Sequence, residues 1–386
     1  MKRNSKLTVV ILIVSLFLSL PILAGEGDES DSQAVFDTFN EVLAYILNYH
    51  VDENEIDELI RGAMDGMADT IDPYSEYMTS DEYKEMQVEY EGHFGGIGIV
   101  ITPDLTIVSP IKGTPGERVG LQSGDNIIAI EGEPTEDMSQ KEAVDLMRGE
   151  PGTEVNITIQ REGVDEPLKF KIIREDVEIP YVEWEMKTDK VGYINIVQFI
   201  QGVGSKVSTA ISELEEQGAE ALLLDLRTNP GGLLDEAISV SSSFLDEGTV
   251  VSVKYRVGSD DIYNVEKDIY TTDLPLVVLI NQGSASASEI VAGAVKDNHR
   301  GILFGKKTFG KGTVQSLFPL NDGSALKLTT GKYYTPSGNF IHEKGIKPDV
   351  EVEYNPDYEG ENDNQLDAAL QYIQDNFFEA EIEPAA

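Results

Sequence analysis

Apolar and polar positions along the chain change their periodicity twice. Residues 35–47 and 55–70 carry apolar side chains at helical spacing, which predicts two helices. From Gly92 to about residue 175, short β-branched runs alternate with turn residues and enclose one helical stretch at 136–149. The first part of the chain is therefore expected to hold a helical region followed by a small β-rich domain.

From about residue 179 the pattern changes to buried strands that alternate with helices. Two continuous apolar runs, 221–227 and 274–280, each lead into a glycine-rich turn and then a helical stretch. Strands of this kind are buried on both faces and form parallel or mixed sheets. This part of the chain therefore predicts an α/β layer, and residues 356–386 predict a C-terminal helix with an acidic end.

The first 24 residues have the features of an export signal. A basic start, KRNSK, precedes an apolar run over residues 7–23. The candidate cleavage site follows Ala24. Ile22 occupies position −3 of that site, where a small residue is preferred, so the site is weak. The run also falls short of the roughly 20 residues that span a bilayer comfortably. The weak cleavage site nevertheless favours a retained membrane anchor over a cleaved signal peptide.

Composition narrows the possible chemistry. The chain contains no cysteine, which excludes disulfides, zinc–thiolate sites, a cysteine nucleophile and a lipoprotein anchor. The formal net charge of −41 disfavours non-specific binding to nucleic acid or to anionic membranes, and it fits adaptation to high salt.

Three alternating serines, Ser284, Ser286 and Ser288, occupy the turn after the apolar run 274–280. The carboxyl ends of buried strands are where α/β sheets place their sites, and the amides of the following helix favour an anion such as a tetrahedral oxyanion. One of these serines is therefore a candidate acyl-transfer nucleophile. Ser286 and Glu289 also have the spacing of a capping box, so a simple helix cap is the alternative.

A nucleophilic serine needs a base. Among the four histidines, His299 is expected at the far end of the helix that follows the serines, and none has the local context of a triad histidine. Lys311 stands between Gly310 and Gly312, and a lysine held in a tight, dry turn can lose its charge and act as a base. An ordinary loop lysine is the alternative.

Six motifs follow one another in the chain. They are GAMDGM (62–67), DPYSEY (72–77), DLR with NPGG (225–232), GSASASE (283–289), TFGKG with Gln315 (308–315) and GIKPD (345–349). In this order they resemble the carboxy-terminal processing (tail-specific) serine proteases, from about Tyr49 to Asp367. The resemblance implies a multidomain α+β or α/β protein, in which a ClpP/crotonase-like α/β protease core carries an inserted PDZ domain and an N-terminal helical segment.

The resemblance also assigns the catalytic roles. It implies that Ser286 is the nucleophile, that Lys311 is its base and that Gln315 supports the lysine. It leaves Ser284 and Ser288 a structural role in satisfying backbone groups. Neither a metal nor a cofactor is implied.

The glycine-rich turn at 225–232 has a role in the same picture. The resemblance implies an oxyanion hole built from backbone N–H groups of Ala287 and of the Gly231–Gly232 region, without deciding which of Gly231 and Gly232 donates. From the residues alone, an ordinary strand-to-helix turn is the alternative.

The β-rich stretch over residues 89–175 resembles a PDZ domain. The implied carboxylate-binding loop consists of Phe94, Gly95, Gly96, Ile97 and Gly98. Successive N–H groups of such a loop capture the C-terminal carboxylate of a peptide, which adds to the next strand. Arg148 matches an arginine that couples the PDZ domain to the active site in some relatives, and a favourable C-terminal helix cap is the alternative.

Together these features predict an exported serine endopeptidase, secreted or membrane-anchored in a bacterial cell envelope, that recognises substrate C-terminal tails through its PDZ domain. The expected domains are an export signal or anchor (1–24), a helical dimerisation region (25–88), the PDZ domain (89–175), the protease core (176–355) and a C-terminal helix and tail (356–386). A homodimer is expected, and nucleic acid is not an expected partner. The alternatives are a catalytically inactive PDZ scaffold and an acyl-CoA enzyme of the crotonase type.

Overall fold

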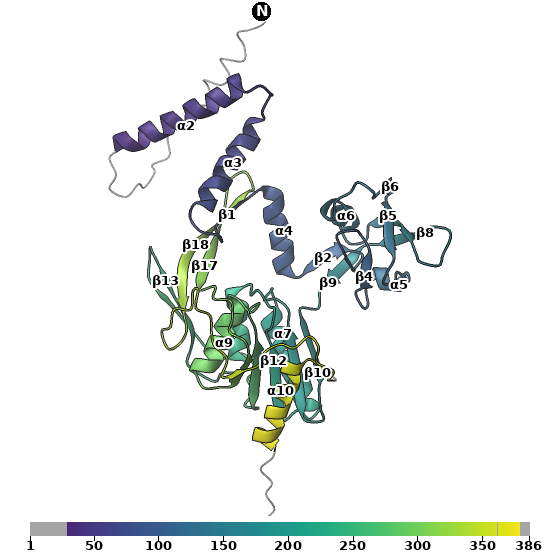
Figure 1. Cartoon of the computed structure of the whole chain (residues 1–386), viewed down its shortest axis with the longest axis vertical. Helices are drawn as coiled ribbons and strands as arrows, with labels where there is room; N and C mark the ends of the chain where they lie inside the picture. Colours follow the sequence, from purple (N-terminus) through teal and green to yellow (C-terminus); the bar gives the residue numbers. More distant parts are fainter. Residues whose placement is uncertain (1–28, 361, 379–386) are drawn as a thin grey trace, which may run out of the picture. The chain divides into compact units, whose positions relative to one another are not determined.

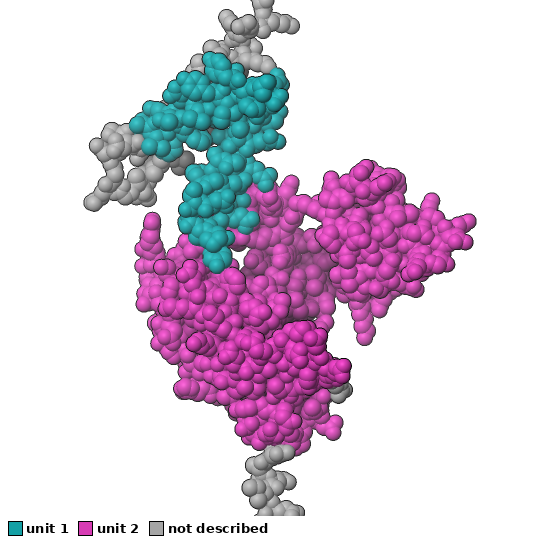
Figure 2. Space-filling model, viewed as in Figure 1, with its two compact units in different colours: residues 1–77 teal, residues 78–386 magenta. Residues whose placement is uncertain are grey.

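The computed structural model describes residues 29–360 and 362–378 of the chain, so the expected export segment 1–24 lies outside the described residues. The chain divides into two compact units, residues 1–77 and 78–386 (Figure 2). Within the described part, no helix combines the length and the apolar character needed to cross a membrane.

The first unit contains the two helices expected from the sequence. They are α2 (Glu29–Tyr49) and α3 (Ile56–Asp69), and a short strand, β1 (Glu76–Met78), begins at the end of this unit. Helix α2 leaves a row of large apolar side chains exposed to solvent, namely Val35, Phe36, Phe39, Val42 and Tyr45. This helix therefore presents an apolar surface that its own unit does not cover.

The second unit starts with α4 (Ser80–Glu91). A capping box of Thr79 and Glu82 stabilises its first turn, and the helix ends at Gly92, which has a φ of 74°. The β-rich domain follows (Figure 1). Its elements are β2 (His93–Gly96), β3 (Ile99–Ile101), β4 (Ile107–Pro110), α5 (Pro115–Arg118), β5 (Asn126–Ile130), β6 (Glu133–Pro134), α6 (Gln140–Met147), β7 (Glu154–Gln160), β8 (Leu168–Ile173) and β9 (Glu175–Glu178).

This domain has its own core. Strands β6, β5, β7 and β8 form one antiparallel sheet in that order, while β3 pairs with β4 and β2 pairs with β9. Buried side chains of β5, β7, β8 and α6 pack together in one apolar cluster. The alternating runs of the sequence are explained by this cluster, because every second residue of β7 points into it.

The α/β part is built on a six-stranded sheet in the order β10-β11-β12-β15-β16-β19. Its strands are β10 (Val182–Met186), β11 (Val191–Ile196), β12 (Ala221–Asp225), β15 (Leu276–Ile280), β16 (Ile302–Gly305) and β19 (Val350–Glu351), and all neighbours are parallel except β10 and β11. The mixed sheet predicted from the two apolar runs is confirmed, since β12 and β15 are its central neighbours.

Helices cover both faces of this sheet. Leu222 and Leu224 belong to the apolar cluster that includes α7 (Val203–Glu216), α8 (Leu234–Ser242) and α9 (Ala287–Asp297). Leu223, which points the other way, packs in a second cluster with the C-terminal helix α10 (Asn364–Ile373). Helix α10 continues as a short π-helix over residues 374–378.

A second, antiparallel sheet was only partly predicted. It contains β18 (Ala325–Tyr334), flanked by β13 (Thr249–Tyr255) and β17 (Thr313–Pro319), with β14 (Asp261–Asn264) beyond β13. Of these strands, the residue pattern marks only ALKLTTGKYY (325–334), which is β18. Strand β17 begins two residues after Lys311, so this sheet carries the loop that contains the lysine.

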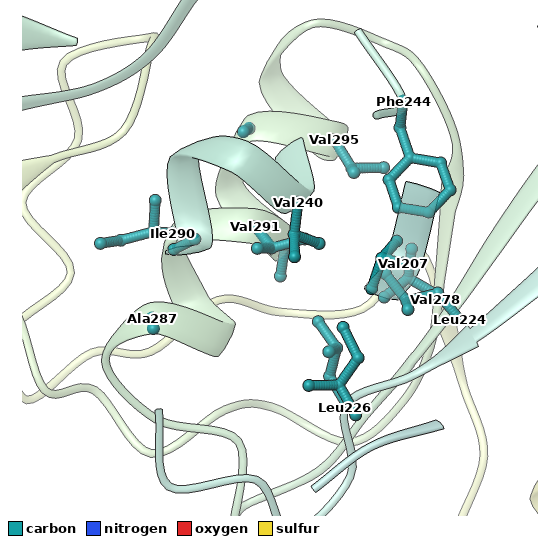
Figure 3. Close-up of a cluster of buried hydrophobic side chains, with 14 of the residues drawn as sticks. Val207, Leu224, Leu226, Val240, Phe244, Val278, Ala287, Ile290, Val291 and Val295 are labelled. Carbon is teal, nitrogen blue, oxygen red and sulfur yellow. The ribbon is translucent and has the colours of Figure 1, made fainter. Parts of the chain in front are cut away.

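Apolar packing fixes the turns at the ends of β12 and β15. Figure 3 shows Val240 and Phe244 of the α8 region and Ile290, Val291 and Val295 of α9 around the strands. Each such buried side chain contributes about 1.5–3 kcal/mol to folding. The two helices that follow the glycine-rich turns are therefore held firmly against the same core.

Candidate active site

Ser286 occupies the N-cap of α9 with an unusual backbone conformation. Its φ is 53° and its ψ is −113°, a combination that residues with a side chain rarely adopt. Such strain costs on the order of 1–3 kcal/mol and persists only where the surroundings over-determine it. The expected helix-cap position is confirmed, but the strain sets Ser286 apart from an ordinary cap.

The two neighbouring serines hold the turn together. The Ser284 hydroxyl donates a hydrogen bond to the Leu226 carbonyl at 2.7 Å, and the Ser288 hydroxyl donates to the Asn229 carbonyl at 3.0 Å. Both side chains are fully buried. Ser284 and Ser288 therefore satisfy backbone groups of the glycine-rich turn, which confirms the structural role expected for them.

Glu289 joins the serine turn to the lysine loop. Its buried carboxylate accepts hydrogen bonds from the Ser286 amide (3.0 Å) and from the Lys311 amide (2.8 Å). It also accepts from Thr308 Oγ1 (2.5 Å) and from the Gly310 amide (2.8 Å). One carboxylate thus fixes the backbone of both predicted catalytic residues. The sequence suggested only a capping residue at this position.

Burial raises the pKa of Glu289, while the hydrogen bonds from Thr308 and from the three amides act in the opposite direction. All four of these groups are donors, and a carboxylate accepts from them without conflict only when it is ionised. The geometry therefore calls for a charged Glu289 in spite of its burial.

Lys311 lies in a loop where the chain passes close to itself. A side chain at Gly310, whose φ is 98°, would meet the Gly345 amide at 3.0 Å, and one at Gly312 would meet the His342 amide at 2.7 Å. The buried Tyr333 hydroxyl donates to the Lys311 carbonyl and lies 3.3 Å from the Ser286 carbonyl. The glycines that flank Lys311 are needed for close backbone approach, as the sequence indicated.

Gln315 lies in β17, four residues after Lys311. Its amide nitrogen donates to Thr313 Oγ1 at 3.1 Å and to Thr329 Oγ1 at 3.2 Å. These contacts fix the side chain along the β17–β18 pair.

The glycine-rich turn lies directly against the serine turn. A Cβ on Gly231 would stand 2.7 Å from Ser286 Cβ and 2.8 Å from the Ala287 nitrogen. The Gly231 amide is engaged, because it donates to Asn229 Oδ1 at 2.9 Å, and Asn229 Nδ2 donates to the Ile196 carbonyl at 2.7 Å. Asn229, which the sequence analysis did not single out, therefore orients this turn.

The Gly232 amide has a different environment. Phe199 forms a parallel bridge with Gly232. The Phe199 amide donates to the Gly231 carbonyl, and the Phe199 carbonyl accepts from the Leu233 amide. In such a bridge the peptide groups of the central residue point away from the neighbouring strand. The Gly232 N–H is thus directed to the side opposite Phe199.

Ile97 and Gly98, the two residues of the predicted PDZ loop that lie between β2 and β3, are both buried. The Ile97 carbonyl accepts from the Gly116 amide, and the Gly98 carbonyl accepts from the Ile111 amide. Within the described part of the chain, neither the Ile97 amide nor the Gly98 amide donates a hydrogen bond. Two successive N–H groups are thus left for a ligand, as an anion-binding loop requires.

The other residues predicted for the loop, Phe94 to Gly96, belong instead to strand β2, which pairs with β9, and they adjoin Arg148, the C-cap residue of α6. The Arg148 guanidinium lies 4.7 Å from the centre of the Phe94 ring, and the neighbouring Gly149 amide donates to the Gly95 carbonyl at 3.0 Å. A positive charge thus stands beside the loop. The structure thus places Phe94 and Gly95 beside Arg148, and it links the backbone of Ser286 to that of Lys311 through Glu289. The contacts of Gln315 are made within the β17–β18 pair.

Comparison with known proteins gives matches over most of the chain. Residues 190–352 match the model of Peptidase family S41, and residues 106–161 match that of the PDZ domain. The chain is 38% identical to a carboxy-terminal-processing protease of Bartonella bacilliformis over 358 residues, which are 89% of this chain and 82% of that protein. The chain belongs to peptidase family S41.

Two further proteins show the extent of the similarity. The carboxy-terminal processing protease CtpA of Bacillus subtilis is 38% identical over 371 residues, which cover 93% of this chain and 79% of that protein. Among solved structures, a photosystem II D1 C-terminal processing protease is 28% identical, with 84% of this chain and 89% of that chain covered and a TM-score of 0.49.

Membership of family S41 makes the chain a serine peptidase, as the motifs predicted. It decides against the acyl-CoA alternative. Ser286, Lys311 and the glycine turn lie inside the part of the chain that matches the S41 model, and Arg148 lies inside the part that matches the PDZ model. The loop from Phe94 to Gly98 precedes that second match.

Proposed function

We propose that this S41 peptidase hydrolyses peptide bonds through a Ser286–Lys311 dyad and selects its substrates by their C-terminal tails. The observation that carries the proposal is the Glu289 carboxylate, which binds the amides of both residues at 3.0 and 2.8 Å. A buried charge is stable only when hydrogen bonds offset its lost hydration. Here those hydrogen bonds hold the strained Ser286 next to the loop that contains Lys311.

The proposed reaction is acyl transfer. Neutral Lys311 takes the proton of the Ser286 hydroxyl as its oxygen attacks the substrate carbonyl, and it then gives the proton to the leaving amine. Water hydrolyses the acyl-enzyme by the same route. The amides of Gly232 and Ala287 stabilise the oxyanion, because the Gly231 amide is already bonded to Asn229.

Gln315 is proposed to orient the amine of Lys311. The amide nitrogen of Gln315 is occupied by two threonine hydroxyls. Its carbonyl oxygen is therefore the group that accepts a hydrogen bond from the lysine amine.

The PDZ domain is proposed to bind the free C-terminus of the substrate. The amides of Ile97 and Gly98, which make no hydrogen bond within the described structure, receive the carboxylate, and the Arg148 guanidinium beside Phe94 adds a favourable charge. Strand β3 pairs only with β4 within the described structure, so its other edge can accept the tail as an additional strand. A coupling role of Arg148 towards the active site is part of this proposal.

Export and a homodimer complete the proposal. The order of a basic start and an apolar run supports export, with retention of residues 1–24 as an anchor at the cell envelope. The exposed apolar row of α2 supports dimerisation through that helix, since a large uncovered apolar surface marks an interaction site.

The decisive experiment follows cleavage of β-casein by mass spectrometry. Wild type is compared with Ser286→Ala and Lys311→Ala, and exposed Ser205→Ala and Lys307→Ala serve as matched controls. We expect both dyad variants to lose at least about a thousandfold in rate and both controls to cut normally. Cleavage that survives Ser286→Ala refutes the dyad, and a wild type that binds tails without cutting supports the scaffold alternative.

A second arm tests tail recognition. We expect a peptide substrate with an amidated C-terminus to show a higher KM than its free-acid twin, because the amide lacks the charge that the loop and Arg148 receive. Equal KM values for the two peptides would remove the PDZ domain from substrate selection.

A further inference from the structure

Arg227, in the DLR motif, has no role in the mechanism above, yet it is one of the most completely bonded side chains in the protein. Its Nε donates to both oxygens of Asp225 at 3.0 Å, and its two terminal nitrogens donate to Asp225, Asp363 and Gln365 at 2.6–3.1 Å. All five N–H groups of the guanidinium are thus used. The Arg227 side chain is only 14% exposed.

The partner Asp363 comes from the other end of the fold. It is the N-cap of α10, where its Oδ1 accepts from the Gln365 and Leu366 amides at 2.9 and 3.0 Å. Both of its oxygens also bind Arg227, at 2.8 and 2.9 Å. Helix α10 packs on the sheet face opposite α9, so this ion pair ties the far layer to the end of β12.

Arg227 also begins the glycine-rich turn. The residue after it, Thr228, has a φ of 59°, and Asn229 then orients the Gly231 amide. The Leu226 carbonyl, just before Arg227, accepts the Ser284 hydroxyl. A shift of Arg227 would therefore move the turn against the nucleophile.

We propose that Asp363 is a positioning residue for the oxyanion site, acting through Arg227 on the glycine-rich turn. The inference rests on the proposed function, because it concerns the same reaction. Asp363 touches neither substrate nor the reacting atoms. It holds the guanidinium from the α10 side while Asp225 holds it from the β12 side.

The simpler alternative is that Asp363 only begins α10 and stabilises the fold. Two substitutions separate the roles. Asp363→Asn keeps a good N-cap but loses the charge that pairs with Arg227. Asp363→Glu keeps the charge but is a poor N-cap. Asp367→Asn, on the same helix and bonded to Tyr358 and Asn362 instead, is the matched control.

The experiment measures kcat and KM on a defined peptide substrate at a temperature well below unfolding, with the full chain and with the active fraction titrated. We expect Asp363→Asn to lower kcat about 10- to 100-fold with KM changed less than about twofold, since small misplacements cost rates of this size. Asp363→Glu should keep a kcat within about threefold of wild type even where its melting temperature falls, because the glutamate carboxylate still pairs with Arg227 and leaves the turn nearly in place.

Two further readouts report on the oxyanion site itself. A peptide aldehyde forms a hemiacetal whose oxygen occupies that site, so its inhibition should weaken by the same factor as kcat in Asp363→Asn. In an Arg227→Ala background, Asp363→Asn should cause no additional loss of kcat.

The outcomes are separable. If wild type does not cleave, the proposed function fails and this inference fails with it. If wild type cleaves and Asp363→Asn keeps a normal kcat, the inference alone is overturned. It is also overturned if kcat in both Asp363 variants only follows the loss of folded protein, or if Asp363→Asn still lowers kcat when Arg227 is absent.

Discussion

Replacing Glu289 by glutamine tests whether its carboxylate fastens the two halves of the dyad. The carboxylate accepts from four donors at 2.5–3.0 Å. A glutamine side chain of the same shape has one acceptor oxygen and presents an NH₂ group to two of those donors. Two hydrogen bonds are therefore lost, and hydrogen bonds to a charged group contribute about 1.5–3 kcal/mol each.

The expected loss of folding free energy is thus about 3–6 kcal/mol, a large part of the roughly 5–15 kcal/mol that stabilises a typical protein. One carboxylate oxygen holds the Ser286 and Lys311 amides, and the other holds Thr308 and the Gly310 amide next to Lys311. The loss of either pair loosens the backbone of the proposed dyad, so we also expect kcat to fall about 100-fold in the molecules that remain folded. Urea unfolding and steady-state cleavage of a peptide substrate measure the two effects separately.

Glu142→Gln provides the matched control. Glu142 also stands third in its helix and accepts from the Ser139 amide and hydroxyl, but it is exposed and has no link to the dyad. Glutamine serves in a capping box as glutamate does, so this variant should behave as wild type. A Glu289→Gln enzyme with normal kcat and normal unfolding would show that the carboxylate is only one cap among others.

The remaining predictions concern the PDZ domain and α2. Burial alone would raise the pKa of Asp125, but its hydrogen bonds with Arg161 and with the Gln122 amide hold that pKa below its usual value. Its stabilising effect is therefore present above the pKa of the unfolded chain and is lost as pH falls through the folded value. Arg161→Ala should destabilise the protein by about 3–5 kcal/mol at neutral pH and by much less in acid, as urea titrations at several pH values would show. Arg148→Ala should raise KM for a free-acid peptide and leave KM for its amidated twin unchanged; equal effects on both would point to a helix-capping role. Phe36→Glu should convert the proposed dimer to monomer in sedimentation velocity without changing the melting temperature, and a dimer that persists would place the interface elsewhere.

The layered core could be predicted from the sequence because its signals are local. The runs 221–227 and 274–280 contain uninterrupted apolar stretches at 221–224 and 276–280, and each run leads into a turn rich in glycine or serine, so a buried strand followed by a turn was the simplest interpretation. The structure places them side by side as β12 and β15. The motif order located Ser286 and Lys311 as well, which Glu289 then brings to one carboxylate.

Features that depend on distant partners could not be predicted. Strands β13 and β17 have mixed apolar and polar residues, and they are stable because each pairs with a different edge of β18. Glu289 looked like a helix cap because the other three of its four donors come from residues 308–311, far along the chain. Asp363 offered no signal at all, since an aspartate before a helix is ordinary until Arg227 is found beside it.

The hydrogen bonds between the serine turn and the glycine-rich turn affect how this enzyme responds to ionic strength. Both bonds that Ser284 and Ser288 make across it come from uncharged hydroxyls to backbone carbonyls. Neutral bonds of this kind neither titrate nor weaken through counter-ion screening. A protein with a net charge of −41 feels strong surface repulsion that changes with ionic strength. The turns that carry the proposed nucleophile and oxyanion site are joined by these neutral bonds, and the glycine-rich turn is also held by the largely buried ion pairs of Arg227, which salt screens much less than exposed charges. Salt should therefore alter how substrates arrive far more than how fast a bound peptide is cut.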